Sequence, residues 1–151
     1  MISHCIRLVD RTVAALNAIP YWVLALIARA ATFSVFWRAG SQKLDDWRST
    51  LSLFANEYHV PILPPELAAK MALSMEIGGS ILILLGLFTR PAVLALLGMV
   101  SVIQIFMYPT AWPDHIQWLA FMALLFARGP GVISLDYMLG RAIHRAAEKR
   151  S

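Results

Sequence analysis

The longest uncharged stretch of the sequence, from Pro91 to Pro113, most strongly constrains the fold. It contains no Asp, Glu, Lys or Arg. Across the whole chain 59% of the residues are hydrophobic and 15% are charged, whereas an ordinary soluble domain has about 25% charged residues. So few charges cannot cover the surface of a soluble domain of this size, and disordered chains are still more polar. The composition therefore predicts a small integral membrane protein with one domain over residues 1–151.

Four apolar stretches predict transmembrane helices. They cover about residues 20–37, 66–88, 91–108 and 114–128. A helix needs about 20 apolar residues to cross a bilayer, with a usual range of about 17–25. The first three stretches fit this range. The fourth is short and taken alone could be a buried or re-entrant segment, but it can span if Arg128 extends toward the lipid head groups.

The segments outside these stretches have amphipathic patterns. Residues 2–19 and 134–150 each place apolar side chains on one helical face and polar or charged side chains, including several arginines, on the other. The link between the first two spans has four aromatic or apolar residues at helical spacing, namely Trp47, Leu51, Phe54 and Tyr58. Such helices lie on a membrane surface that contains anionic lipid. We therefore expect an all-α membrane protein, a four-helix antiparallel bundle with amphipathic interfacial helices.

The distribution of basic residues predicts the orientation, because Lys and Arg are enriched in cytosolic segments. One side of the predicted bundle carries Arg7, Arg11, Arg90, Arg128, Arg141, Arg145, Lys149 and Arg150, and the other carries Arg38, Lys43, Arg48 and Lys70. The larger group places both termini in the cytosol, which requires an even number of spans. This clustering at the chain ends also explains the net charge of +4 without a nucleic-acid partner. A motif that resembles a cleavage site, Ala28-Arg29-Ala30, lies inside an apolar run that continues to Trp37, so we expect an uncleaved first span.

Two charged residues, Arg29 and Glu76, fall near the middle of predicted spans and are the candidate catalytic residues. Arg29 lies nine residues after Pro20 and Glu76 ten after Glu66, so both should lie about 14–15 Å deep, near the midplane. Since a lone charge there costs several kcal/mol, we expect the two to pair. The pair is either a structural contact between helices or a site for a proton or a cofactor.

Further polar residues are candidates for cofactor binding. Gln104 and Tyr108 lie on one stripe of the third span, which is either an inward polar seam or a set of hydrogen-bond partners for a quinone-like carbonyl. His115 and Trp118 lie near the outer interface. His59 and His115 with nearby carboxylates could bind a metal, but without an HxH or HExxH motif solvated loops are favoured and no metal site is predicted.

An ordered set of motifs in this sequence resembles the DoxX family. The set comprises an Arg in the first span, Ala39-Gly40-Ser41-Gln42-Lys43-Leu44, Glu76-Ile77-Gly78-Gly79, Leu85-Gly86-Leu87-Phe88-Thr89-Arg90, and Gly129-Pro130-Gly131 with Ser134-Leu135-Asp136. The likeness covers about residues 23–138, and several strings are similar to a proteobacterial branch of the family. Carried over position by position, the family pattern points to Arg29, Lys43, Glu76 and Asp136. Lys43 joins the candidate cofactor-binding residues on this ground.

The resemblance implies a multi-pass protein of the bacterial inner membrane that works in oxidoreduction. Founding members of the family belong to a thiosulfate:quinone oxidoreductase, and others act beside redox, stress or metal-handling proteins. Relatives with dithiol chemistry have a cysteine pair, whereas this chain has only Cys5, so thiol exchange is not expected. The implied partners are the bilayer, the quinone pool and a redox or metal-handling protein, and a homo-oligomer is compatible with these features.

Two functions follow from these observations. The first is a membrane redox component that exchanges electrons between quinone, the candidate cofactor, and a partner protein. The second is a non-enzymatic membrane protein that anchors a partner or transports a small solute or metal. The lack of haem, flavin and nucleotide motifs in the sequence favours the second function, whereas the resemblance and the buried charges favour the first.

The predicted topology can be tested by protease accessibility in inside-out and right-side-out membrane vesicles. Tags at both termini should be cleaved from the cytosolic side only, because the basic residues at both ends are retained there. Cleavage of the two tags from opposite sides would contradict an even number of spans.

Overall fold

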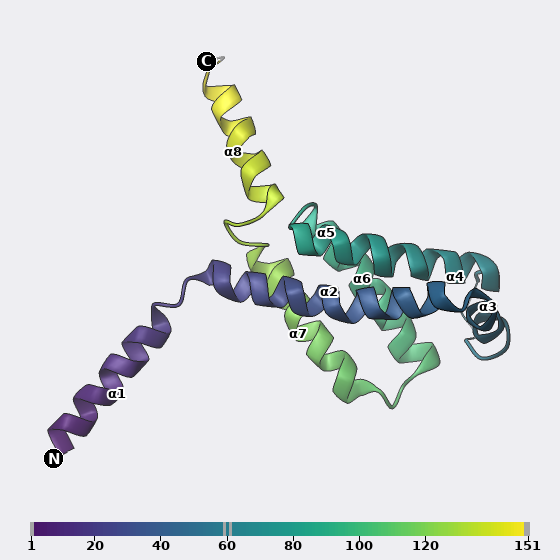
Figure 1. The fold of residues 1–151 in the computed structure, drawn as a ribbon, viewed down its shortest axis with the longest axis horizontal. Coiled ribbons are helices and arrows are strands. Elements are labelled where there is room, and N and C mark those ends of the chain that lie inside the picture. Colours follow the sequence, from purple (N-terminus) through teal and green to yellow (C-terminus); the bar gives the residue numbers. More distant parts are fainter. Residues whose placement is uncertain (1, 59, 61, 150–151) are drawn as a thin grey trace.

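The structure, a computed structural model, describes residues 2–58, 60 and 62–149 (Figure 1). Every regular element in these residues is a helix. Two of the helices contain a wider π-helical turn, η1 or η2. The elements are α1 (Ile2–Asn17), α2 (Tyr21–Asp45), α3 (Trp47–Asn56), α4 (Pro65–Ser74), η1 (Met75–Gly79), α5 (Ser80–Leu85), α6 (Thr89–Val102), η2 (Ile103–Met107), α7 (Trp112–Arg128) and α8 (Leu135–Glu148). The predicted all-α class is confirmed.

Helix α2 is the centre of the bundle. It packs against α5 and α7, and also against α4 and η1. Helix α6 in turn packs against α7. The side chains of Ile83, Leu96, Met122 and Leu125 are fully buried where α5, α6 and α7 meet. One apolar core therefore joins the helices, as expected when each helix buries a single face.

Three helical segments are long and apolar enough to cross a membrane. They are α2, the continuous helix Pro65–Leu85 and the continuous helix Thr89–Met107. These correspond to the first three predicted spans, although α2 continues to Asp45 instead of ending near Trp37. Helix α7 has 17 residues, at the lower end of the range that can span, so the fourth span stays a prediction.

The amphipathic segments form helices as predicted. Helices α1 and α8 extend away from the bundle at the two ends of the chain (Figure 1). Helix α3 instead packs on α4, where Phe54 contacts the buried Ala68 and Ala69. The apolar faces of α1 and α8 are exposed, with Leu8 and Ile143 each 68% accessible, which agrees with helices that lie on lipid.

Arg29 joins two segments through backbone carbonyls. Its side chain is buried, its Nε donates to the carbonyl of Ile83 at 3.0 Å, and a terminal nitrogen donates to the carbonyl of Leu84. The other terminal nitrogen donates to the carbonyls of Pro130 and Ile133. The carbonyls at a helix C-terminus have no partner in the helix and carry a partial negative charge. Arg29 therefore caps α5 and fixes the segment between α7 and α8.

The predicted pairing of Arg29 with Glu76 is wrong. Glu76 lies beside Gly40 of α2, eleven residues beyond Arg29, which is about 16 Å along a helix. The predicted depths assumed that the first span ends near Trp37, but α2 extends eight residues beyond this apolar run. Glu76 therefore faces a later part of α2 than the turn that contains Arg29.

Two further contacts fix the end of the bundle where Arg29 lies. Gly86 has a positive φ of 65°, and a Cβ there would lie 2.5 Å from the Ser134 Cβ and 3.1 Å from the Arg29 Cζ. Only glycine fits both the backbone conformation and the space. Asp136 accepts hydrogen bonds from the backbone N–H groups of Phe88 and Thr89, at 2.8 and 3.0 Å, and so caps the start of α6.

Replacing Arg29 should destabilise the bundle. Arg29→Met leaves buried carbonyls unsatisfied, and we expect a loss of at least about 2 kcal/mol. Arg29→Lys should recover only part of this, because an ammonium lacks the planar fork of donors. Thermal unfolding in detergent measures the effect, with the exposed Arg48→Met as control. Equal melting temperatures for Arg29→Met and Arg48→Met would contradict the capping role.

Candidate functional site

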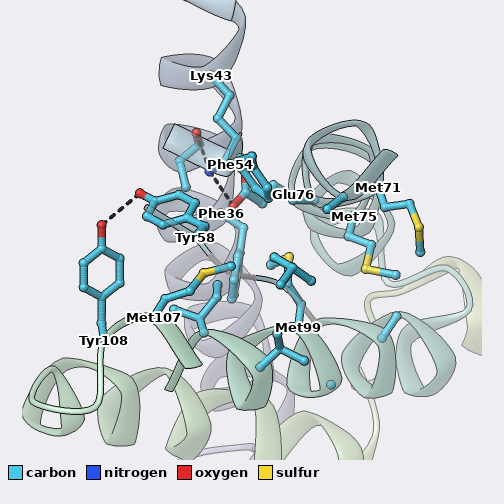
Figure 2. Close-up of a pocket in the computed structure, with 18 of the residues that line it drawn as sticks. Phe36, Lys43, Phe54, Tyr58, Met71, Met75, Glu76, Met99, Met107 and Tyr108 are labelled. Carbon is cyan, nitrogen blue, oxygen red and sulfur yellow. Dashed lines mark hydrogen bonds and ion pairs between the residues drawn. The ribbon is translucent and has the colours of Figure 1, made fainter. Parts of the chain in front are cut away.

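A cavity of about 690 Å³ lies between α2, α3, α4–η1, α6–η2 and α7 (Figure 2). Its wall is mainly apolar and aromatic. The lining residues are Val35, Phe36, Arg38, Ala39, Gln42, Lys43, Phe54, Tyr58, Val60, Leu63, Ala68, Met71, Ala72, Met75, Glu76, Leu94, Ala95, Gly98, Met99, Val102, Ile103, Met107, Tyr108, His115 and Trp118. A cavity of this volume with a mainly apolar wall is typical of binding sites for small ligands.

Among the described residues that line this cavity, the one carboxylate belongs to Glu76, which is 3% exposed. Its Oε1 lies 2.8 Å from the Nζ of Lys43, and the Lys43 side chain is 20% exposed. Its Oε2 is buried and has no hydrogen-bond partner among the described residues. A buried carboxylate normally satisfies both oxygens, so Glu76 retains the capacity to accept one more hydrogen bond.

Gly40 sets the contact that brings Lys43 to Glu76. A Cβ at Gly40 would lie 2.6 Å from the Ile77 Cδ1 and 3.2 Å from the Glu76 Cβ. The absence of a side chain therefore allows α2 to approach η1 closely. Lys43 lies three residues further along α2, on the same helical face as Gly40.

The two π-helical turns lie beside the cavity. Glu76 belongs to η1, and Ile103 and Met107 line the cavity from η2. A π-turn inserts one extra residue into a helix, and such turns occur frequently at functional sites. Here they redirect side chains within otherwise regular apolar spans.

Two tyrosines form a hydrogen bond at one side of the cavity. The hydroxyl oxygens of Tyr58 and Tyr108 are 2.8 Å apart, and the Tyr58 ring packs edge-on against Phe54 (Figure 2). Burial, and after it the hydrogen bond with Tyr108, raise the pKa of Tyr58 above its usual value. Tyr58 therefore stays a neutral hydroxyl at physiological pH and ties the α3–α4 link to the end of η2.

His115 lines the cavity in a fixed orientation. Its Nδ1 lies 2.6 Å from the Gln104 Oε1, while the Gln104 Nε2 donates to the carbonyl of Pro109 at 2.8 Å. Because the amide nitrogen of Gln104 is committed to Pro109, its oxygen accepts the Nδ1–H of His115. The neutral ring therefore keeps Nε2 as an acceptor. The ring also packs against Trp118, with centroids 4.8 Å apart.

The structure gathers most of the sequence-predicted site residues around one cavity. Lys43, Glu76, Tyr108, His115 and Trp118 all line it. Gln104 lies behind His115 rather than in the wall, and Arg29 lies apart with its carbonyl partners. The catalytic role of Arg29 stays a prediction. His59 lies outside the described residues, and within them no group of three or more His, Cys, Asp or Glu could hold a metal.

Sequence reasoning missed several residues of the cavity. Phe54 and Tyr58 were expected only as part of a surface helix, yet both line the cavity. Four methionines also line it, namely Met71, Met75, Met99 and Met107. The spacing of Gly40 and Lys43 could have indicated the ion pair. A small residue such as Gly40 permits close contact with a second helix, and Lys43 follows it by about one helical turn on the same face.

A sequence profile of one family, DoxX, matches residues 24–109, more than half of the chain. The chain belongs to the DoxX family. The matched part of this DoxX protein begins in α2, ends just after η2, and includes Lys43, Glu76 and Tyr108. Helix α7, with His115 and Trp118, lies beyond the match. No curated protein and no solved structure matches the chain.

The close helix contact at Gly40 can be tested with a matched pair of glycines. Gly40→Ala forces Ile77 to move, and we expect the overpacking to cost about 1–3 kcal/mol, offset in part by the better helix propensity of Ala. Gly78→Ala, on η1 itself, meets nothing within 4 Å and should be neutral or slightly stabilising. Thermal unfolding of both variants in detergent checks this. A neutral Gly40→Ala would contradict the close contact.

Proposed function

We propose that this DoxX protein binds a quinone-like ring compound in the cavity and that Glu76 exchanges a proton with a ring hydroxyl. The observation that carries the proposal is the buried Glu76 carboxylate, with one oxygen held by Lys43 and the other without a partner among the described residues. Such an acceptor is costly unless a ligand, a water or a proton satisfies it.

The residues of the cavity fit a ligand of this kind. The wall is apolar over most of its area, and methionine side chains adapt to irregular shapes. The cavity volume of about 690 Å³ accommodates a substituted ring with part of an isoprenoid tail. Because the cavity lies among helices that are apolar enough to cross a membrane, such a ligand could enter from the lipid.

The polar groups of the cavity have distinct roles in the proposal. Glu76 accepts the proton from a hydroxyl, and Lys43 stabilises the carboxylate charge and fixes its orientation. His115 offers the lone pair of Nε2 as a second acceptor. A quinol releases two protons and two electrons on oxidation, and the electrons would pass to a redox partner protein.

The location follows from the same reasoning. We propose a bacterial inner-membrane protein with four spans and both termini in the cytosol, α7 being the fourth span. The surplus of basic residues at the ends supports this orientation.

A second candidate function is transport or handling of a soft metal ion. The observation that favours it is the set of methionines in the cavity wall, because thioethers prefer ions such as Cu(I). Mass spectrometry of ligands that copurify in mild detergent separates the candidates: a quinone supports the first, and copper with no quinone supports the second.

Quinol binding can be tested with two glutamates on one helix. Glu76 is buried and paired with Lys43, whereas Glu66 is exposed and paired with Lys70 at 2.6 Å. Glu76→Gln should weaken binding of a short-chain quinol analogue at least about tenfold, because it removes a charged hydrogen bond. Glu66→Gln should bind as the wild type does. Thermal shift titration measures both, and equal affinities would contradict the proposal.

A double substitution separates ligand binding from stability. Lys43→Met with Glu76→Leu removes both charges and keeps the apolar volume, so the fold should persist. The variant should melt near the wild-type temperature and fail to bind the analogue. The matched control is Lys70→Met with Glu66→Leu. Full binding by the first double variant would leave the ion pair with a structural role only.

A further inference from the structure

A second hollow lies at the opposite end of the bundle, near the Arg29 contacts. It has a volume of about 710 Å³ and lies between the start of α2, the α5–α6 turn and the segment from α7 to α8. None of the residues proposed for ligand binding in the first cavity lines it. The hollow is therefore separate from the first cavity.

Two guanidinium groups converge on this hollow from different helices. The Nε of Arg90 donates to the carbonyl of Phe126 at 3.1 Å, and its terminal nitrogens make no hydrogen bond to the described residues. The guanidinium of Arg128 lies over the Tyr21 ring, 4.4 Å from its centroid, which leaves its N–H groups free to donate outward. Guanidinium donors of this kind recognise phosphate oxygens in a fork geometry.

The acid in the hollow does not cancel these charges. Both carboxylate oxygens of Asp136 already accept backbone N–H groups at the start of α6. Asp136 keeps its negative charge, but among the described residues that line the hollow two guanidinium groups stand against this one carboxylate, and the remaining positive charge favours an anion.

A buried hydroxyl provides an independent indication of a ligand. Thr89 lines the hollow and is fully buried, and its Oγ1 has no hydrogen-bond partner among the described residues. A buried hydroxyl without a partner is rare and is commonly satisfied by a ligand or an ordered water.

The surroundings of the hollow favour a lipid over a free ion. Exposed apolar side chains form its rim, with Phe88 63% and Val132 50% accessible. The amphipathic helices α1 and α8 both leave the bundle at this end (Figure 1), and both carry basic side chains. Aromatic and basic residues in this arrangement are typical of the head-group layer of a bilayer.

We infer that this hollow binds the phosphate of an anionic phospholipid through Arg90 and Arg128. The acyl chains lie along the exposed apolar rim, and the bound lipid connects the starts of α2 and α8 to the membrane surface. The inference is independent of the function proposed for the first cavity.

The test compares lipids that differ only in their head groups. The full-length protein in detergent is titrated with short-chain phosphatidylglycerol and with phosphatidylcholine of the same acyl length, and thermal stability is measured. We expect phosphatidylglycerol to raise the melting temperature more. Equal effects of the two lipids would overturn the inference. Equal stabilisation by inorganic phosphate would place a free anion in the hollow and overturn the lipid assignment.

Substitutions locate the binding site. Arg128→Gln loses the contact with the Tyr21 ring and a cation in the last turn of α7, both at the edge of the bundle, and should fold. It should nevertheless bind phosphatidylglycerol about tenfold more weakly, as expected for the loss of one charge-assisted contact. Arg128→Lys should retain part of the affinity. The matched control is Arg145→Gln on α8, which should change the affinity less than about twofold, because exposed charges interact weakly.

Arg90→Gln should weaken phosphatidylglycerol binding to a similar degree. If Arg90→Gln fails to fold, the comparison of Arg128→Gln with Arg145→Gln decides the matter alone. Equal affinities for those two variants would overturn the inference.

Discussion

The burial of the Glu76 carboxylate depends on one ion pair. An unpaired charge in a water-excluded interior costs several kcal/mol, and Lys43 provides the compensating cation at 2.8 Å. Gly40 brings α2 close enough to η1 for the contact, and Glu76 itself lies in the π-helical turn. The Lys43–Glu76 pair thus lies where α2 and η1 approach closely, and it lines the apolar cavity.

The two ends of the bundle differ in how they satisfy polar groups. Around Arg29 and Asp136, side chains satisfy backbone groups at helix ends and tie the inter-helix segments together. Around Glu76, a charged side chain keeps an oxygen without a partner among the described residues. The first arrangement is typical of structural rigidity, and the second is typical of a site that holds a ligand.

Hydropathy alone predicted the helical class, the amphipathic ends and four spans, because each depends on local runs or periodicity of apolar side chains. The first three spans correspond to helices that are apolar enough to cross a membrane. It did not predict that α2 continues to Asp45. Ala39 to Leu44 include polar residues, yet they continue the helix because backbone hydrogen bonding does not require an apolar side chain. This error placed Arg29 rather than Lys43 opposite Glu76.

The sequence predicted which residues belong to the site better than it predicted their contacts. Buried charge, a polar stripe, family motifs and position near the outer interface identified five residues that line one cavity, namely Lys43, Glu76, Tyr108, His115 and Trp118. The contact between Tyr58 and Tyr108 joins residues fifty positions apart. Neither this long-range contact nor the two π-turns, Met75–Gly79 and Ile103–Met107, was predicted from a local pattern in the sequence.

The proposed function requires the Glu76 carboxylate to accept a hydrogen bond or a proton from the ligand. Infrared difference spectroscopy of the purified protein, with and without a short-chain quinol analogue, detects this event at the carboxylate itself. A carboxylate band should shift or disappear on ligand binding, and this difference signal should be absent in Glu76→Gln and present in Glu66→Gln. A carboxylate signal that persists in Glu76→Gln, or no signal on binding to the wild-type protein, would contradict it.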